Sequence, residues 1–226
     1  MERIAVDRFV AKEAQFSESI KILRTNLLFS GADVQIVGLT SCNASEGKSF
    51  ISFQLAASLG QTGKRVLLLD ADLRNSTLPY RLKMHSKVNG LSHYLTGMAN
   101  IEELIHSTDV PNLYIMFSGI RVPNAVELLG SNRLKKLIPA LREAFDYVIV
   151  DTASLGLEID SAVIAPELDG MVIVMDSTNN SYKQERRIKQ QLEKTGGKIL
   201  GVVLNRMEPV GKGRKYGGYG CGERVK

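Results

Sequence analysis

Residues 39–50 read LTSCNASEGKSF, and this stretch joins an apolar run at residues 34–40 to a helical pattern at residues 48–62. The apolar run is rich in Val, Ile and Leu without alternation, which is typical of a strand covered on both faces. The helical pattern repeats apolar residues every three or four positions. A buried strand that turns through a glycine-containing loop directly into a helix is the setting of a phosphate-binding loop, or P-loop.

Three residues give this loop its chemistry: Gly47, Lys48 and Ser49. Backbone N–H groups at a helix N-terminus attract anions, a lysine in this place reaches the β- and γ-phosphates of a nucleotide, and the hydroxyl ligates Mg²⁺. The match to the full pattern GxxxxGK[ST] is incomplete, because Cys42 occupies the position of its first glycine. For the tripeptide taken alone, an ordinary turn between a strand and a helix is the alternative.

Carboxylates follow two further apolar runs. LLLDADLR ends a strand with Asp70 and Asp72, and FDYVIVDT carries Asp151 at its end. In open α/β sheets the ligand crevice lies at the carboxyl ends of the strands, so we expect all three near the loop. Asp151 is placed to hold a Mg²⁺ water opposite Ser49. The alternative is that Asp70 and Asp72 only cap the next element, but the three features together favour a nucleotide site.

The remaining pattern predicts an α/β fold with three layers, α/β/α, and a mainly parallel central sheet, which is the P-loop NTPase architecture. We expect one P-loop domain over residues 1–210, with a leading helix at about residues 12–30, and a flexible tail over residues 211–226. Strands are predicted at 34–40, 65–70, 147–151, 171–175 and 198–205, and further helices at 134–145 and 184–197.

The amino-acid composition excludes several classes of protein. Of 226 residues, 44% are hydrophobic and 23% charged, which excludes a chain disordered throughout, collagen and a coiled-coil rod. No run approaches about 18 consecutive apolar residues, and the N-terminus lacks the apolar middle of a signal peptide, so we expect a cytoplasmic protein. Two cysteines and three histidines without ligand spacing argue against redox chemistry and a metal-binding quartet.

The last sixteen residues, GKGRKYGGYGCGERVK, hold five Lys or Arg against one Glu, which is +4 of the net charge of +5. The rest of the chain is nearly neutral, so we expect no nucleic-acid partner. Tyr216 and Tyr219 lie in this segment, where no core can bury a ring, and flanking glycines let the backbone enter a neighbouring active site in extended form. An ordinary disordered end is the alternative to a kinase substrate here.

These motifs resemble the bacterial tyrosine kinases (BY-kinases) of capsule and exopolysaccharide assembly, which are relatives of the MinD/ParA-type P-loop ATPases. The resemblance covers nearly the whole chain. LLLDADLR is similar to the family's Walker A′ segment. Residues 89–97 and 118–131 are similar to two later segments of the family. The tail is similar to the tyrosine cluster that these kinases autophosphorylate. Glu18, Lys21 and Arg24 are similar to the Glu-x-x-Arg-x-x-Arg pattern that mediates ring assembly, with Lys21 in place of the first arginine.

The resemblance implies an ATP-dependent, Mg²⁺-requiring protein-tyrosine autokinase that phosphorylates Tyr216 and Tyr219 of a neighbouring subunit and so regulates polysaccharide synthesis and export. It also implies a homo-oligomer, for which a ring is one possible form. A membrane adaptor of the polysaccharide co-polymerase type would recruit the chain to the inner face of the membrane and complete the nucleotide site. A tyrosine phosphatase is the expected counterpart that removes the phosphate.

The resemblance also assigns roles to the site residues. Lys48, Asp70 and Asp72 would be catalytic, with Asp70 the candidate to accept the tyrosine proton, although either aspartate fits that role. Ser49, Asp72 and Asp151 would hold Mg²⁺. The nucleotide would lie against Asn43, Ala44, Ser45, Glu46, Gly47, Lys48, Ser49 and Phe50, with Arg206 near the adenine.

The sequence departs from the family pattern at several places. Ser45 replaces a glycine, Phe50 replaces a hydroxyl that commonly binds the α-phosphate, and Ala153 and Ser154 stand where two prolines are usual. Asn43 replaces the signature lysine of MinD and ParA. Two alternative functions follow: a nucleotide-binding scaffold of a polysaccharide-export complex with weakened catalysis, and a MinD/ParA-type ATPase without a protein substrate.

Overall fold

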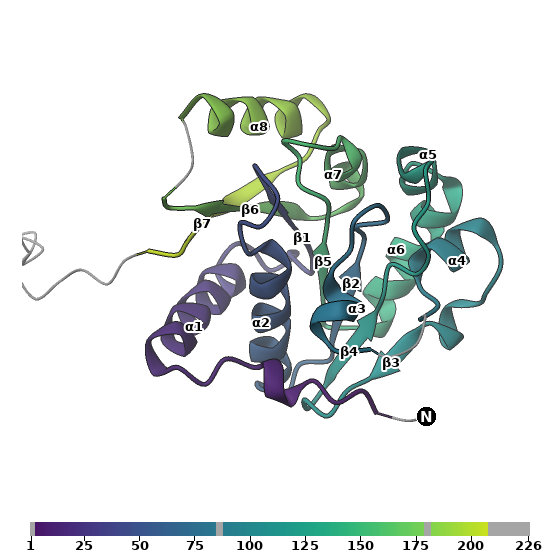
Figure 1. The fold of residues 1–226 in the computed structure, drawn as a ribbon, viewed down its shortest axis with the longest axis horizontal. Helices are drawn as coiled ribbons and strands as arrows, with labels where there is room; N and C mark the ends of the chain where they lie inside the picture. Colours follow the sequence, from purple (N-terminus) through teal and green to yellow (C-terminus); the bar gives the residue numbers. More distant parts are fainter. Residues whose placement is uncertain (1–2, 85–87, 179–181, 208–226) are drawn as a thin grey trace, which may run out of the picture.

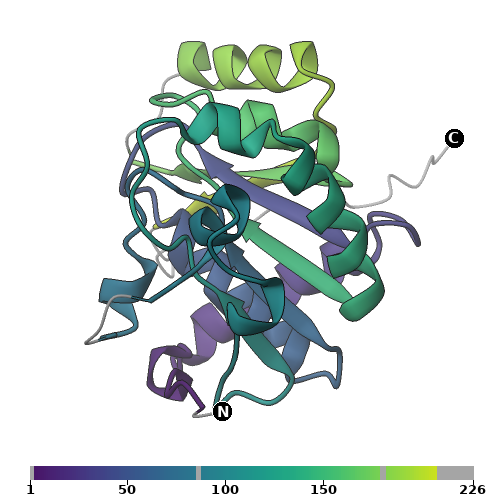
Figure 2. The same cartoon turned by 90° about the vertical axis from the view of Figure 1, so that its right-hand side faces the viewer.

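The computed structural model describes residues 3–84, 88–178 and 182–207. In this part of the chain, seven strands form one sheet in the order β3-β4-β2-β5-β1-β6-β7, and only β3 and β4 pair antiparallel. Helices cover both faces (Figures 1 and 2), which confirms the predicted three-layer fold. The strands are β1 (Ile36–Ser41), β2 (Val66–Asp70), β3 (Ile105–Ser107), β4 (Leu113–Met116), β5 (Tyr147–Asp151), β6 (Gly170–Asp176) and β7 (Ile199–Asn205).

The five strands that the sequence predicts are all present, with small shifts at their ends. β1, β2 and β6 are buried along their whole length and β5 along nearly all of it, as expected for strands between two helical layers. β7 lies at one edge of the sheet and is only partly covered. The antiparallel pair of β3 and β4 at the other edge was not predicted.

The helices form two layers with separate apolar cores. The core with α1 and α2 lies on one face of the sheet, and the core with α4 to α8 lies on the other. α1 corresponds to the predicted leading helix, and α6 continues through Pro139. The helices are α1 (Ala14–Leu28), α2 (Lys48–Gly60), α3 (Leu78–Arg81), α4 (Leu91–Thr96), α5 (Ala125–Leu129), α6 (Asn132–Ala144), α7 (Asp160–Ile164) and α8 (Tyr182–Lys194).

The strand order reverses at β1, which lies between β5 and β6. Loops that follow strands on the two sides of such a point form the ligand crevice of open α/β sheets. β1, β2 and β5 end there at Ser41, Asp70 and Asp151, and the last two are register partners across the β2–β5 pair. The topology therefore brings the glycine-containing loop and the predicted carboxylates to one edge of the sheet.

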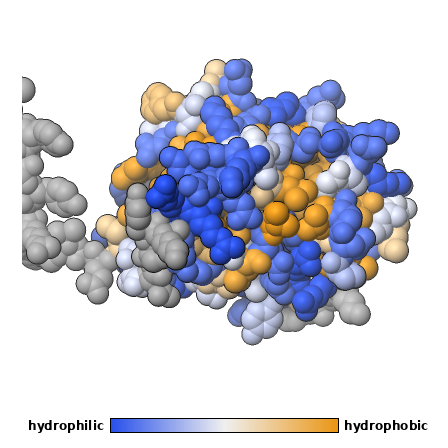
Figure 3. Space-filling model, turned by 90° about the horizontal axis from the view of Figure 1, so that it is seen from above, coloured by the Kyte–Doolittle hydropathy of each residue, from blue (hydrophilic) through white to orange (hydrophobic). Residues whose placement is uncertain are grey.

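Within the described ranges, no helix has the length and apolar character needed to span a bilayer. Seen from above, the molecule is largely hydrophilic, with an apolar area in its middle (Figure 3). α8, which lies at the top in Figure 1, contributes to this polar surface with the sequence YKQERRIKQQLEK.

Candidate active site

The loop between β1 and α2 has the backbone shape of an anion cradle. Gly47 is the N-cap of α2 and has a φ of 91°, in the left-handed region that favours glycine. A Cβ on Gly47 would lie 2.2 Å from Nδ2 of Asn205, so no larger residue fits without movement. Because α2 is 13 residues long and its cap has no side chain, its first N–H groups are offered to a ligand.

The end of β7 supports this loop from outside. Asn205 donates from Nδ2 to the carbonyl of Glu46 at 2.9 Å, and Arg206 donates from Nη2 to the carbonyl of Ser45 at 2.8 Å. Arg206 also forms an ion pair with Asp176 at the end of β6. Arg206 is therefore attached to the loop and is not among the residues that line the adjoining cavity.

Ser45 has the unusual backbone that a glycine adopts easily. Its φ is 64°, in the left-handed region, where a residue with a side chain is strained by about 1–3 kcal/mol. The sequence departure at this position therefore leaves the loop conformation in place, and the bond from Arg206 to the Ser45 carbonyl helps to hold it. The strain is a local cost, offset by contacts on both sides of the loop.

Asn43 and Glu46 form the inner frame of the loop. The Glu46 carboxylate is almost fully buried and accepts hydrogen bonds from the backbone N–H of Asn43 at 3.0 Å and from its Nδ2 at 3.1 Å. The Asn43 carbonyl accepts from the hydroxyls of Ser41 and Ser154 at 2.9 and 3.1 Å. Ser154, which replaces a family proline, thus ties the end of β5 to the loop.

Lys48 and Asp151 meet at the base of the site, a contact that the sequence analysis did not predict. Lys48 Nζ lies 2.8 Å from Asp151 Oδ1, and the two side chains are 8% and 2% exposed. The hydroxyl of Ser52 also donates to this oxygen at 3.3 Å. Parallel pairing on both sides of β5 fixes the carboxylate, and the first turn of α2 fixes the lysine.

The structure separates Asp70 from Asp72. Asp70 is completely buried, and its carboxylate accepts from the N–H of Asp72 at 3.2 Å, the N–H of Ser118 at 3.3 Å and the hydroxyl of Ser76. Burial, and then repulsion from Asp151, raises the pKa of Asp70 to about 7. Asp72 instead lines the cavity next to the loop. Of the two carboxylates, Asp72 alone borders the space where a substrate would lie.

The cavity beside the loop has a volume of about 260 Å³ and three walls. One wall is the loop and the start of α2, the second follows β2, and the third follows β5. Eight lining residues are not among the predicted site residues: Ser41, Asn75, Thr77, Arg81, Ala153, Ser154, Leu157 and Glu158. For Arg81 a signal exists, because the proline in STLPYR is typical of a helix start and could have placed Arg81 on a short helix beside the loop. The lining residues are Ser41, Ala44, Ser45, Glu46, Gly47, Lys48, Ser49, Phe50, Asp72, Asn75, Thr77, Arg81, Ala153, Ser154, Leu157 and Glu158.

The donors around this cavity suit Mg²⁺ in a complex with phosphates. Among the described residues, no group of three His, Cys, Asp or Glu side chains converges as a metal cage. Mg²⁺ commonly uses one or two carboxylates and completes its shell with water and phosphate oxygens. Ser49 and Asp72 line the cavity, and Asp151 lies at its base on Lys48. These hard oxygen donors therefore fit the ion that the loop motif implies.

The three residues of the predicted assembly pattern on α1 point to different neighbours. Glu18 and Lys21 pair with each other on the exposed face at 3.2 Å. Arg24 instead donates from Nη1 to the carbonyl and the hydroxyl of Ser58 on α2, both at 3.0 Å. Arg24 thus fastens α1 to the P-loop helix. The predicted substrates, Tyr216 and Tyr219, lie outside the described residues.

Phe50 couples the cavity to the leading helix. The Phe50 ring lies against that of Phe16 on α1, with 5.2 Å between the ring centroids, and the residue also lines the cavity. The hydroxyl that the family carries at this position is replaced by an aromatic contact between two helices. Phe50 therefore contacts α1 and also forms part of the cavity wall.

A P-loop on a β1–α2 turn, with carboxylates at the ends of neighbouring parallel strands, defines a P-loop ATPase domain. A family model described as an AAA domain matches residues 11–198. The fold is also similar to MinD from Pyrococcus horikoshii in complex with Mg-ADP, with a TM-score of 0.65 at 23% identity over 76% of this chain and 70% of that one.

Sequence relatives narrow the class further. The chain is 38% identical over 222 residues to tyrosine-protein kinase CpsD of Streptococcus agalactiae, covering 98% of this chain and 97% of that one. It is 34% identical to tyrosine-protein kinase YwqD of Bacillus subtilis, covering 90% and 86%. The kinase domain of Escherichia coli tyrosine kinase ETK superposes with a TM-score of 0.79 at 30% identity, covering 89% and 80%. The chain belongs to the bacterial tyrosine-protein kinase family and is a tyrosine-protein kinase.

Proposed function

We propose that this kinase is an autokinase that transfers the γ-phosphoryl group of ATP to Tyr216 and Tyr219 of a neighbouring copy and thereby regulates capsular or exopolysaccharide synthesis and export. The observation that carries the proposal is the contact of Lys48 with Asp151 at the base of a cavity bordered by the P-loop. Tyr216 and Tyr219, in a glycine-rich and basic stretch of sequence, would be the acceptors, because flanking glycines allow an extended backbone to enter an active site.

ATP would lie in the cavity with its phosphates on the loop. The N–H groups at the start of α2 and the Lys48 ammonium bind phosphate oxygens, and Ser49, Asp72 and Asp151 hold Mg²⁺. Mg²⁺ would supply positive charge that neutralises the phosphates. Lys48 would exchange part of its contact with Asp151 for the phosphates, and the Asp151 carboxylate would then be available to hold the ion.

The chain's own residues provide positioning and a proton acceptor. The phenolic oxygen bonds to the γ-phosphorus as the bond to the β-phosphate oxygen breaks, and ADP leaves. We assign the phenolic proton to Asp72, because Asp72 borders the cavity whereas Asp70 is completely buried. Asp70 then acts on Asp72 indirectly, by accepting the N–H of Asp72. Charge neutralisation contributes more than the base in phosphoryl transfer.

Assembly would bring the tail of one copy to the site of the next. Two apolar side chains are exposed here, Ile22 on α1 at 56% and Phe29 directly after α1 at 85%, and they support α1 as the contact surface. We propose that a membrane adaptor recruits the chain to the inner face of the membrane; similarity to the chimerical protein CapA2B2, with a TM-score of 0.82 at 32% identity, supports a partner of this kind. A tyrosine phosphatase would reverse the reaction.

The test is phosphotyrosine mapping by mass spectrometry after incubation with Mg²⁺ and γ-labelled ATP, with and without the adaptor's cytoplasmic segment. We expect label on Tyr216 and Tyr219, none in the Lys48→Met variant, and none in the Tyr216→Phe/Tyr219→Phe variant although that variant still binds ATP. Label that persists elsewhere in the double variant would refute the tail as the main target. Nucleotide binding without any label on tyrosine would refute the autokinase.

A further inference from the structure

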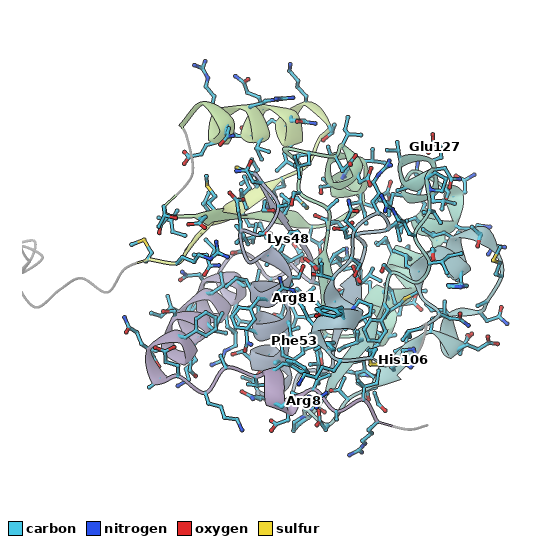
Figure 4. The ribbon with its side chains drawn as sticks, viewed as in Figure 1. Arg8, Lys48, Phe53, Arg81, His106 and Glu127 are labelled. Carbon is cyan, nitrogen blue, oxygen red and sulfur yellow. The ribbon has the colours of Figure 1, made fainter. Side chains whose placement is uncertain are left out.

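Arg81 places a second cation at the cavity of the P-loop. It ends the short helix α3 and lines the cavity from the wall that follows β2, whereas Lys48 lines it from α2. The two residues are labelled in Figure 4. The side chain of Arg81 is exposed, and its Nε–H donates to the hydroxyl of Thr77 at 3.1 Å. This bond holds the guanidinium group through its Nε.

Carboxylates outnumber basic residues in the lining of the cavity, so the Arg81 cation matters for binding an anion there. Three carboxylates line the cavity, from Glu46, Asp72 and Glu158, against only two cations, from Lys48 and Arg81. Lys48 is already paired with the buried Asp151. None of the ion pairs within the described ranges involves Arg81. Arg81 is thus the basic lining residue that can meet an anionic ligand without first leaving a carboxylate.

We propose that Arg81 is a further catalytic residue, whose guanidinium group binds the γ-phosphoryl group of ATP during transfer to tyrosine. The inference rests on the proposed placement of ATP in this cavity. An arginine presents paired N–H donors that match two phosphate oxygens, and an arginine supplied by the same chain stabilises charge on a transferring phosphoryl group. Arg81 gains and loses no proton: the bond from the γ-phosphorus to the β-phosphate oxygen breaks, the bond to the phenolic oxygen forms, and the proton leaves to Asp72.

The test compares Arg81→Ala, Arg81→Lys and a control, Arg187→Ala, which removes an exposed arginine on α8 that does not line the cavity. The acceptor is a synthetic peptide spanning residues 211–226, and kcat, KM for peptide and the Kd for ADP are measured with the Tyr216→Phe/Tyr219→Phe chain as background. We expect kcat to fall about 100-fold in Arg81→Ala and about tenfold in Arg81→Lys, with the Kd for ADP within about twofold of the parent and Arg187→Ala unchanged.

Three results would overturn the assignment. If kcat of Arg81→Ala stays within about threefold of the parent, the guanidinium does not act on the phosphoryl group. If KM for the peptide rises while kcat is unchanged, Arg81 belongs to the acceptor site. If affinity for ADP falls together with the melting temperature, its role is structural. Failure of the parent chain itself to bind ATP would instead refute the proposed function, so the two failures are distinguishable.

Discussion

At the scale of single residues, Asp70 ties the chemistry of the site to the stability of the fold. Burial, and then the neighbouring Asp151, raises the pKa of this carboxyl from 3.8 to about 7, while Ser76 opposes the shift by donating its hydroxyl. Between these two pH values the folded chain binds more protons than the unfolded chain at this position. The free energy of unfolding must therefore fall as the pH rises, and a carboxyl with this shift contributes about 4 kcal/mol to that loss.

The corresponding prediction compares the wild type with Asp70→Asn. From pH 4 to pH 8 we expect the wild type to lose about 4 kcal/mol of unfolding free energy relative to the variant, because the amide cannot ionise. Urea unfolding at several pH values measures this difference. The slope is the readout, since the amide also changes the contact with Ser118 at every pH. Parallel pH profiles for the two proteins would contradict the account of Asp70.

Gly47 offers a second test at this scale, with Gly63 as a matched control. Both have positive φ, 91° and 87°, but a Cβ at Gly63 meets nothing within 4 Å, whereas one at Gly47 lies 2.2 Å from Asn205 Nδ2. Both alanine variants should therefore lose about 1–2 kcal/mol from backbone strain, and Gly47→Ala alone should weaken ATP binding, by at least about tenfold. Equal ATP affinities, measured by calorimetry, would contradict the role of the loop shape.

At the scale of elements, α1 depends on Arg24 for its attachment to α2. The guanidinium makes two partly buried hydrogen bonds to Ser58, whereas Lys21 makes one exposed ion pair. We predict that Arg24→Ala lowers the free energy of unfolding by about 1–2 kcal/mol, and that Lys21→Ala changes it by less than about 0.5 kcal/mol. Chemical denaturation checks both. A loss of assembly in Arg24→Ala without any loss of stability would show instead that Arg24 acts at the subunit contact.

The elements also show which features a sequence can predict. Five strands are continuous apolar runs in the sequence, so their hydropathy pattern alone identifies them. β3 has three half-buried residues and pairs antiparallel with β4 at the edge, and such short edge strands carry little periodicity. In the site, the loop and Asp151 follow from motif spacing. The burial of Asp70 and the contact of Arg24 with α2 depend on which elements pack against these residues. Spacing along the sequence does not determine this packing.

At the scale of the whole molecule, the active-site edge of the sheet is also where the described chain ends. β7 contacts the P-loop through Asn205, and the sequence that contains the two proposed acceptor tyrosines begins two residues after Arg206, at residue 208. α1, the proposed contact surface, packs on the helix that begins at the same loop. The cavity and the proposed assembly surface on α1 are therefore both connected to the P-loop.

The most direct test of this account is a mixing experiment with two complementary variants. Lys48→Met keeps both acceptor tyrosines and lacks the loop lysine, and Tyr216→Phe/Tyr219→Phe keeps the loop and lacks the acceptors. The two are mixed with Mg²⁺, γ-labelled ATP and the adaptor's cytoplasmic segment, and phosphotyrosine is mapped by mass spectrometry. We predict label on Tyr216 and Tyr219 of the Lys48→Met chain. A mixture that stays unlabelled, while the wild type labels its own tail, would contradict transfer between subunits.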